Sequence, residues 1–248
     1  MVLDRFVRSC YRIPGFLIYS LYHSMRLARI VKRYPDDPKL VHAHLLRFIE
    51  GVHKLMGIHV TVQGELPSEP SVFMGNHRSY VDAVLIPSTF PVTFVARSES
   101  EHWPIIGWGA TLLGTIWVNR KDPDSRRSTR DRVRERLEDG RSIIIFPEGT
   151  THKGPGLLEY RPSMFYICAE GGFPITPVAI EYKDPDIAWV GNDWFIPHAW
   201  KHFGKKRIEV SVTFGETQRF EDGGVAQTAI HSWTEKTVAS LREAYDRS

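Results

Sequence analysis

From His59 onward, short apolar runs alternate with segments of helical pattern, and this alternation constrains the fold more than any other feature. The runs predicted to be β-strands are HVTVQG, SVFMG, VTFVA, GTIWV, SIIIF, ITPVAIEY and RIEVSVTF. Strands that alternate with helices are typical of an α/β sheet with helices on its faces. The sequence therefore predicts an α/β domain with a mixed sheet flanked by helices. The helices are expected near residues 80–89, 104–113, 123–139, 162–171, 197–203 and 225–246.

The first 57 residues have a different pattern, with two amphipathic helices and no strand. The first helix is expected over 2–33 with a kink at Pro14-Gly15, and the second over 38–56, with the turn YPDDP between them. In the second helix the apolar residues recur at spacings of three and four. We therefore predict two parts of the chain, an amphipathic two-helix hairpin at 1–57 and an α/β domain at 58–248.

Charge is unevenly distributed along the chain. The formal net charge is only +3, but residues 1–57 contain ten Lys and Arg against four Asp and Glu, a net charge of +6. A basic, aromatic-bearing amphipathic hairpin favours the surface of a membrane with anionic lipids, and we predict membrane lipids as a partner. Packing of both helices on the main domain is the alternative. No nucleic-acid motif is recognised, so nucleic acid is not expected as a partner.

Composition sets the expected compartment. Two cysteines far apart in sequence, Cys10 and Cys168, predict no disulfide framework and favour a reducing compartment. Early arginines interrupt any signal-peptide core, and no run of about 18 uncharged apolar residues occurs. We therefore expect neither export nor a spanning helix.

The stretch GNHRSYVD, residues 75–82, places a histidine, an arginine and an aspartate between two apolar runs. A helix is expected to begin at Tyr80, with Ser79 as its N-cap and Asp82 at the third helical position, which matches a capping-box pattern. In one interpretation Asp82 only caps this helix, and His77 is an ordinary loop residue.

The same geometry permits a catalytic interpretation. The loop before the helix can fold back so that Asp82 meets one imidazole nitrogen of His77, fixes its tautomer and leaves the other nitrogen to accept a proton. The chain has no GxSxG elbow, so the nucleophile would be a substrate hydroxyl that His77 deprotonates. Such a reaction needs an activated acyl donor with a good leaving group, such as a thioester.

Two further stretches place polar residues at the carboxyl ends of predicted strands, where α/β sheets bind ligands. After SIIIF comes PEGT, in which Glu148 offers a carboxylate, Gly149 allows close approach to the backbone and Thr150 offers a hydroxyl. After GTIWV comes Arg120, a residue type suited to bidentate phosphate binding. A plain strand-to-loop turn and a solvated arginine are the alternatives.

Together, in this order and spacing, these motifs resemble those of the glycerolipid acyltransferase family, whose best-known members are the 1-acylglycerol-3-phosphate acyltransferases. The resemblance covers about residues 58–220. The N-H-x-x-x-x-D and F-P-E-G-T blocks are complete, and the G-x-(I/F)-(F/I)-x-R block and the proline-containing apolar strand are also matched. The matching residues are Asn76, His77, Asp82, Gly114, Ile116, Arg120, Phe146, Pro147, Glu148, Gly149, Thr150 and Pro177.

The resemblance implies the glycerolipid acyltransferase fold and an enzyme that moves a fatty acyl group from acyl-CoA or acyl carrier protein to a lysophospholipid hydroxyl, first of all that of 1-acylglycerol-3-phosphate. It implies that His77 and Asp82 form the catalytic dyad. No metal and no bound cofactor are implied. The residues implied to bind the acceptor phosphate or headgroup are Arg120, Glu148, Gly149 and Thr150, with Arg161 an additional candidate where the family has a lysine.

Bacterial members of that family dock on the membrane with a helical hairpin. The resemblance therefore implies that residues 1–57 are a membrane-interface anchor. We expect a peripheral or monotopic protein on the cytoplasmic face of a bacterial inner membrane.

The sequence departs from the family pattern at Asn119, Thr151 and Ser163, all on the phosphate side of the site. Lyso-ornithine lipid, lysophosphatidylcholine and glycerol 3-phosphate therefore stay open as acceptors. A thioesterase or lipid hydrolase that uses water in the same dyad, and a non-catalytic membrane-binding protein, are the alternatives of another class.

Three other segments are open to more than one interpretation. GWGATLLG has the wrong spacing for a dinucleotide loop and is expected to be a packed helix, with a possible place in an acyl tunnel. RRSTRDRVRERLEDG is expected to be a solvated helix with i,i+4 ion pairs, and a docking face for an acidic carrier protein or lipid headgroups is the alternative. DWFIPHAWKHFG, residues 193–204, is either a second membrane-facing element or an edge of the core.

Overall fold

The computed structural model of the chain describes residues 2–190 and 193–247. The predicted domain limits at residues 1 and 248 lie outside them. The seven expected strands all form and join one sheet in the order β1-β7-β6-β2-β5-β3-β4. The strands are β1 (Ile58–Gln63), β2 (Val72–Gly75), β3 (Val92–Arg97), β4 (Ile116–Val118), β5 (Ser142–Ile145), β6 (Ile175–Tyr182) and β7 (Ile208–Phe214).

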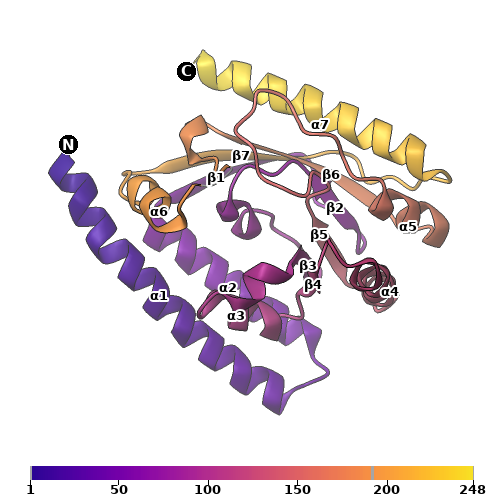
Figure 1. Ribbon diagram of the computed structural model, residues 1–248, viewed down its shortest axis with the longest axis horizontal. Helices are drawn as coiled ribbons and strands as arrows, with labels where there is room; N and C mark the ends of the chain where they lie inside the picture. Colours follow the sequence, from indigo (N-terminus) through magenta and orange to yellow (C-terminus); the bar gives the residue numbers. More distant parts are fainter. Residues whose placement is uncertain (1, 191–192, 248) are drawn as a thin grey trace.

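Helices cover both faces of this sheet, as Figure 1 shows, with α7 on one side and α1 and α2 on the other. All pairs of neighbouring strands are parallel except β6 and β7, which are antiparallel. The predicted mixed sheet flanked by helices is confirmed. The α-helices are α1 (Val2–Arg33), α2 (Pro38–Met56), α3 (Ile106–Leu112), α4 (Pro123–Glu138), α5 (Ser163–Gly171), α6 (Phe195–Phe203) and α7 (Gly223–Asp246).

One predicted helix was wrong in length and type. In place of a helix over 80–89, the chain forms a 3-10 helix, η1 (Tyr80–Val84). Pro87 explains the early end, because the residue before a proline is pushed out of the helical region of backbone space. Two further 3-10 helices, η2 (Ser98–His102) and η3 (Pro185–Ile187), were not predicted.

The strands at the centre of the sheet are buried on both faces. In β2, Phe73 packs into the cluster beneath α2 and α6, whereas Val72 and Met74 pack into the cluster beneath α4, α5 and α7. This alternation follows from the two-residue period of a strand. Since β2, β5, β3 and β4 are parallel, their carboxyl ends lie on one edge of the sheet, where the polar motifs follow.

The N-terminal hairpin is docked on the body of the molecule by buried polar contacts. The helix α1 is continuous through Pro14, and α2 ends at Gly57, whose positive φ of 70° closes the helix before β1 begins. Arg12 of α1 is buried and donates to the carbonyl oxygens of Phe203 (3.0 Å) and Lys205 (2.6 Å). A guanidinium at this position complements the negative end of the α6 dipole, so part of the basic charge of the hairpin is structural.

Two histidines of α2 hold the end of η1 and the segment that follows it. The Nε2 atom of His42 lies 3.0 Å from the carbonyl oxygen of Ser88, and that of His53 lies 2.6 Å from the carbonyl oxygen of Val84. The carbonyls can only accept, so both rings donate. Burial lowers the pKa of both histidines below the usual value.

These lowered pKa values predict that acid weakens the fold. The unfolded chain takes up protons below about pH 6.5, whereas the folded rings of His42 and His53 resist protonation. Stability is therefore full above this pH and falls as the pH drops through it. We expect the urea midpoint of unfolding to fall between about pH 7 and about pH 5, and to fall less in the double variant His42→Gln, His53→Gln, which keeps an N–H donor at both positions. Equal pH dependence of the two proteins would contradict this assignment.

Other histidines with a pKa lowered by burial add to the same trend: His23, His44, His198 and His202.

Candidate active site

The loop between β2 and η1 brings His77 and Asp82 together. Ser79 caps η1, and the Asp82 carboxylate accepts the backbone N–H of Ser79 (2.9 Å), as the capping-box pattern predicted. The same Oδ2 atom lies 2.8 Å from Nδ1 of His77. Capping and pairing with His77 are therefore not alternatives, because one carboxylate does both.

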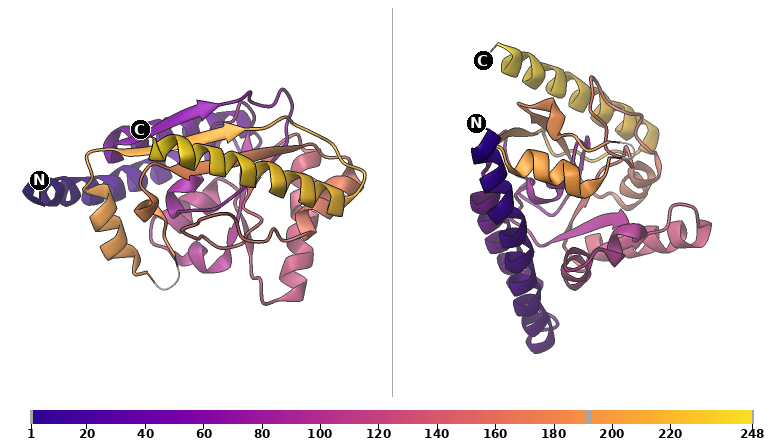
Figure 2. Two further views of the ribbon diagram at one scale, coloured as in Figure 1. Left: turned by 90° about the horizontal axis from the view of Figure 1, so that it is seen from above. Right: turned by 60° about the vertical axis from the view of Figure 1, so that its left-hand side comes forward.

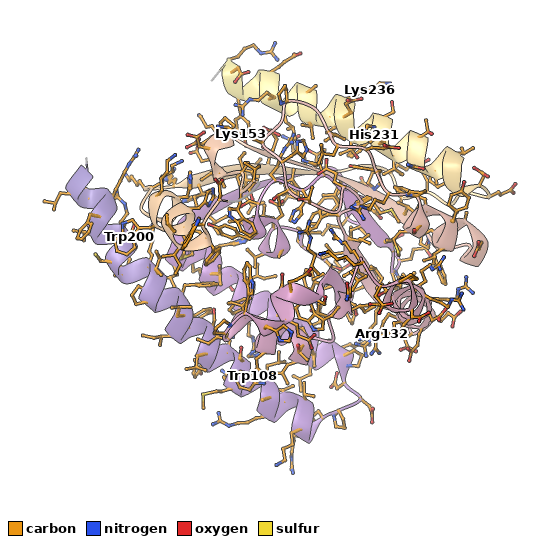
Figure 3. The ribbon with its side chains drawn as sticks, in the orientation of Figure 1. Trp108, Arg132, Lys153, Trp200, His231 and Lys236 are labelled. Atoms are coloured by element: carbon orange, nitrogen blue, oxygen red, sulfur yellow. The ribbon has the colours of Figure 1, made fainter. Side chains whose placement is uncertain are left out.

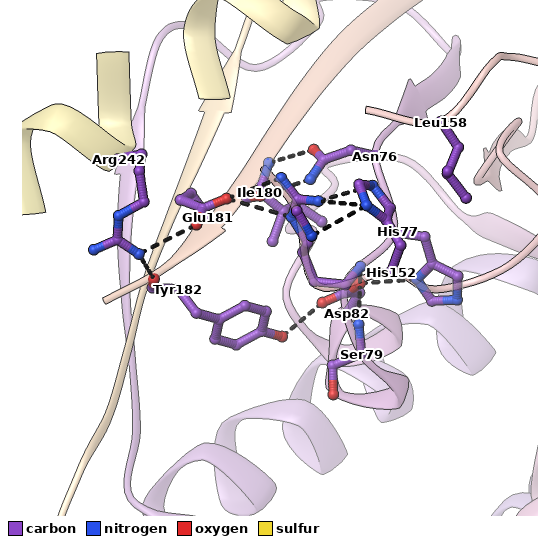
Figure 4. A network of polar contacts seen from close by, with 12 residues as sticks. Asn76, His77, Ser79, Asp82, His152, Leu158, Ile180, Glu181, Tyr182 and Arg242 are labelled. Carbon is purple, nitrogen blue, oxygen red and sulfur yellow. Dashed lines mark hydrogen bonds and ion pairs between the residues drawn. The ribbon is translucent and has the colours of Figure 1, made fainter. Parts of the chain in front are cut away.

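Asp82 is fully buried and receives four hydrogen bonds (Figure 4). Besides His77 and Ser79, the backbone N–H of Arg78 donates to Oδ2 (2.6 Å), and the hydroxyl of Tyr182 donates to Oδ1 (2.6 Å). All four of these groups donate, and the two oxygens of the carboxylate accept. Because that carboxylate can only accept, Nδ1 of His77 carries the proton and Nε2 is left to accept one.

The ring of His77 is held in place but is accessible. It stacks on Phe146, with 4.2 Å between ring centroids and 4° between planes. Its backbone N–H donates to Oε2 of Glu148 at 2.9 Å. The His77 side chain is still 23% exposed. A base with a fixed tautomer, a fixed ring plane and one open nitrogen can take a proton from a hydroxyl that approaches from solvent or from a lipid surface.

Glu148 is buried, and both of its oxygens have partners within the protein. Oε2 accepts from His77, while Oε1 accepts the N–H of Leu158 (3.2 Å) and lies 3.1 Å from Nε2 of His152. The prediction that Glu148 binds the acceptor headgroup stays a prediction. The structure gives it a different contact, the backbone of the histidine in the dyad.

Three arginines converge on Gly149. Arg97 donates from Nη2 to the Gly149 carbonyl oxygen at 2.7 Å, and Arg120 donates from Nη1 to the same atom. A Cβ atom at Gly149 would lie 2.7 Å from Nε of Arg161, and φ at this residue is +74°. Only glycine accommodates both the backbone conformation and the approach of Arg161.

Arg97 is a member of this cluster that the sequence reasoning missed. The signal was available, because VTFVAR ends a predicted strand in arginine just as the segment before Arg120 does. The cluster is strongly electropositive: burial, followed by repulsion from Arg97 and Arg161, lowers the pKa of Arg120 to about 10, while Glu99 opposes the shift. A bound anion would relieve this repulsion.

The dyad and the arginine cluster are held by consecutive residues. Glu148 contacts the backbone of His77, and Gly149 accepts from Arg97 and Arg120. Consecutive Cα atoms are only about 3.8 Å apart. One tight turn after β5 therefore holds both the backbone of His77 and the three arginines.

A second buried network supports the loop of the dyad from the side of α7 (Figure 4). Arg78 is buried and pairs with Glu181 at 3.2 Å, and Glu181 also meets Arg242 of α7 at 3.4 Å. The His152 ring lies between Arg78 and Glu148. Burial raises the pKa of Glu181, and the two arginines oppose that shift. Apart from Glu148, none of these residues was predicted, because they come from segments far apart in sequence.

The remaining residues of the predicted motifs serve the local structure or face solvent. Asn76 is buried and makes two hydrogen bonds to the backbone of Ile180, one donated from Nδ2 (2.7 Å) and one accepted by Oδ1 (2.8 Å). The Pro147 carbonyl accepts the N–H of Arg161 at 3.0 Å, which sets that arginine beside the cluster. Thr150 is exposed.

Two other motif residues shape the backbone. Gly114 adopts a positive φ of 81° just before β4, and Pro177 lies in β6 opposite Met74 of β2. In the part of the chain that the structure describes, no cluster of three His, Cys, Asp or Glu is arranged to hold a metal ion.

The family model described as Acyltransferase matches residues 57–181, half of the chain and all of the loops described above. The chain belongs to this acyltransferase family. The predicted relationship is thereby confirmed at the level of the family.

Relatives of this acyltransferase-family protein are named for several acceptor lipids, among them lyso-ornithine lipid, 1-acyl-sn-glycerol-3-phosphate and lysophosphatidylcholine. It is 35% identical over 158 residues to the lyso-ornithine lipid O-acyltransferase of Pseudomonas aeruginosa, covering 62% of this chain and 61% of that protein. It is 26% identical over 187 residues to the 1-acyl-sn-glycerol-3-phosphate acyltransferase of Neisseria gonorrhoeae, covering 71% and 72%. The chain thus spans about three fifths of the length of the first relative.

The fold has a solved counterpart. The crystal structure of the 1-acyl-sn-glycerophosphate (LPA) acyltransferase PlsC from Thermotoga maritima matches with a TM-score of 0.74, over 97% of this chain and 98% of that one. The two sequences are 17% identical, so the likeness concerns the fold, including the N-terminal helix pair.

The contacts of Asn76 generate a prediction about stability. Asn76→Ala would leave the buried N–H and carbonyl of Ile180 without partners, and we expect a loss of about 2 to 4 kcal/mol in the free energy of unfolding, measured with urea. Asn119→Ala, at an exposed position, is the matched control and should stay close to the parent protein. Equal effects of the two substitutions would contradict the clamping role of Asn76.

Proposed function

We propose that this protein is an O-acyltransferase that moves a fatty acyl group from an acyl thioester to the hydroxyl of a lysolipid. The observation that carries the proposal is the placement of His77: Asp82 fixes its Nδ1 proton, its side chain remains accessible, and the next turn holds three arginines around Gly149. A general base beside an anion site suits an acceptor that carries both a hydroxyl and an anionic headgroup.

The proposed reaction is a direct transfer. Nε2 of His77 takes the proton of the acceptor hydroxyl as the hydroxyl oxygen attacks the thioester carbonyl, and the charge on the imidazolium is balanced by Asp82. The carbon–sulfur bond then breaks, the thiolate of CoA or acyl carrier protein leaves, and the imidazolium returns the proton to it. The new bond is an ester, and no acyl-enzyme forms. The chain itself supplies both members of the dyad, so no bound cofactor is needed, and the thioester is a co-substrate.

For the acceptor we propose a lysolipid whose headgroup anion lies against Arg97, Arg120 and Arg161. A phosphate dianion suits three guanidiniums best, so 1-acylglycerol-3-phosphate is the first acceptor, and the product is phosphatidic acid. Lyso-ornithine lipid, which carries a carboxylate, is the second, and the names of several relatives favour it. Gly149 and the exposed Thr150 complete this part of the site.

The outer face of α1 supports the proposed membrane association. Its exposed side chains form an apolar stripe at helical spacing along nearly the whole helix, while its arginines and lysines lie to the side and at its end. No helix in the described residues is long and apolar enough to cross a membrane. A helix of this kind lies in the membrane interface, and we propose the cytoplasmic face. The stripe comprises Leu3, Phe6, Val7, Tyr11, Leu17, Ile18, Leu21, Tyr22 and Met25.

The first test is thiol release from acyl-CoA, or from acylated carrier protein, by the purified protein in detergent or liposomes. We expect release that depends on 1-acylglycerol-3-phosphate or on lyso-ornithine lipid, and a loss of at least about a hundredfold in His77→Ala, because general base catalysis contributes that much. His59→Ala, at an exposed position in β1, is the matched control and should retain activity.

The other outcomes identify the alternatives. Release of free fatty acid without an acceptor would show a hydrolase. Absence of release with both thioester donors and every lysolipid would leave a non-catalytic membrane-binding protein. Activity that survives in His77→Ala would contradict the dyad while leaving acyl transfer in place.

The arginine cluster generates a separate prediction about the acceptor. Arg97→Gln should lower kcat/KM for the lysolipid by about tenfold or more while the KM for the thioester stays nearly constant, because a charge-assisted hydrogen bond to the headgroup is lost. Arg134→Gln is the matched control, since Arg134 is an exposed arginine of α4 that pairs with Glu170. A fall in thioester affinity instead would place the donor at this cluster.

A further inference from the structure

The first turn of α6 exposes large apolar side chains. Trp194 is 82% exposed and Ile196 is 72% exposed, and Phe195 between them is also partly exposed. We call Trp194, Phe195 and Ile196 the α6 tip. Contiguous exposed side chains of this size are uncommon on soluble proteins and mark surfaces that contact a partner or a membrane.

The α6 tip belongs to a helix that is fastened to α1 (Figure 2). Ser9 of α1 donates to the carbonyl oxygen of Trp200 at 2.7 Å, and Arg8 donates to that of Gly204 at 2.8 Å. The rings of Phe6 and Trp200 lie 5.7 Å apart, and Figure 3 shows Trp200 between the two helices. The apolar stripe of α1 therefore continues onto α6 through Trp200, which is itself partly exposed.

The helix that carries the tip combines tryptophans with basic side chains at its carboxyl end. The four basic side chains of residues 193–207 lie toward the carboxyl end of α6, where Lys201 pairs with Asp186 and Lys205 pairs with Asp184. Tryptophan beside lysine and arginine is the composition of a membrane interface, where the indole ring lies at the level of the headgroups and the basic groups meet lipid phosphates. The adjoining hairpin has the same composition, with a net charge of +6.

The α6 tip also adjoins the dyad. Phe195 packs on Tyr80, the first residue of η1, with 4.9 Å between ring centroids, and the Tyr80 hydroxyl lies 3.2 Å from Nδ1 of His198 in α6. Asp82 lies in the same short helix as Tyr80. A lipid surface in contact with the tip would therefore face the segment that carries the dyad.

We propose that the α6 tip is a second lipid-contact element, which together with the stripe of α1 seats the protein on the membrane close to His77 and Asp82. This inference rests on the proposed membrane association of α1, and it resolves the open interpretation of DWFIPHAWKHFG in favour of a membrane-facing element.

The test measures binding to vesicles of phosphatidylethanolamine and phosphatidylglycerol by sedimentation. We expect Trp194→Ser and Ile196→Ser each to lower the partition coefficient about tenfold, the effect of keeping one large apolar side chain in water. Val225→Ser is the matched control, since Val225 is 61% exposed on α7 and should not change binding. Circular dichroism and urea unfolding check that each variant folds.

A second measurement uses the tryptophan itself. Lipids brominated in their acyl chains quench indoles that enter the bilayer, so Trp194→Phe, which keeps an apolar ring, should bind almost as well but lose part of the quenching. The proposal would be overturned if Trp194→Ser and Ile196→Ser bound vesicles as well as the parent protein and Trp194→Phe showed unchanged quenching.

Two further outcomes separate this inference from others. The parent protein could instead dimerise through the tip, so that Ile196→Ser loses the dimer while vesicle binding stays unchanged. This result would show that the surface binds a second copy of the chain, and it would overturn the proposal. A parent protein that binds no vesicles would overturn the membrane association itself, whereas loss of acyl transfer with vesicle binding intact would overturn only the proposed activity.

Discussion

The buried carboxylate of Asp82 is the group on which the arrangement of the site depends. Removing an ion from water costs several kcal/mol, and the protein offsets this cost with two backbone N–H groups, the hydroxyl of Tyr182 and the ring of His77. These four donors fix three parts of the fold: the loop after β2, the end of β6 and the ring of His77. Burial and proximity to Asp82 raise the pKa of Tyr182 well above its usual value, so this hydroxyl remains a donor.

The turn after β5 contacts both His77 and the arginine cluster. Phe146 stacks on the His77 ring, Glu148 holds its backbone, and Gly149 gathers the arginines. A shift in this turn would therefore move the base and the anion cluster together. This coupling gives a physical reason for an unbroken F-P-E-G-T block. The acidic residue of the block, Glu148, holds the backbone of His77, and the arginines surround the carbonyl of Gly149.

The proposed lipid-contact element α6 and the proposed dyad meet at η1. The α2 helix holds the last residue of η1 through His53 and the segment after it through His42, and α6 packs on Tyr80, the first residue of η1, through Phe195. A short 3-10 helix has few internal hydrogen bonds and depends on such neighbours for its position. One of the two proposed lipid-contact surfaces, the α6 tip, thus lies on an element that sets the position of Asp82.

Much of this protein could be predicted from the sequence, because the decisive signals are local. Strand–helix alternation predicted seven strands, amphipathic spacing predicted the two N-terminal helices, and Ser79 and Asp82 predicted the cap of η1. The spacing of the motifs predicted the family, which the comparison confirmed. The error at 80–89 was also local in origin, since Pro87 ends the helix early. The roles of His77 and Asp82 stay predictions until activity is measured.

The tertiary structure alone decided which distant side chains meet. Arg97 and Arg161 join Arg120 only because β3, β4 and β5 are parallel neighbours, and Tyr182 reaches Asp82 only because β6 pairs with β2. Strand order is set by packing of the whole sheet and leaves no local pattern in the chain. The sequence therefore determined the elements and the chemistry available at their ends, while the pairing of strands decided which of those ends form one site.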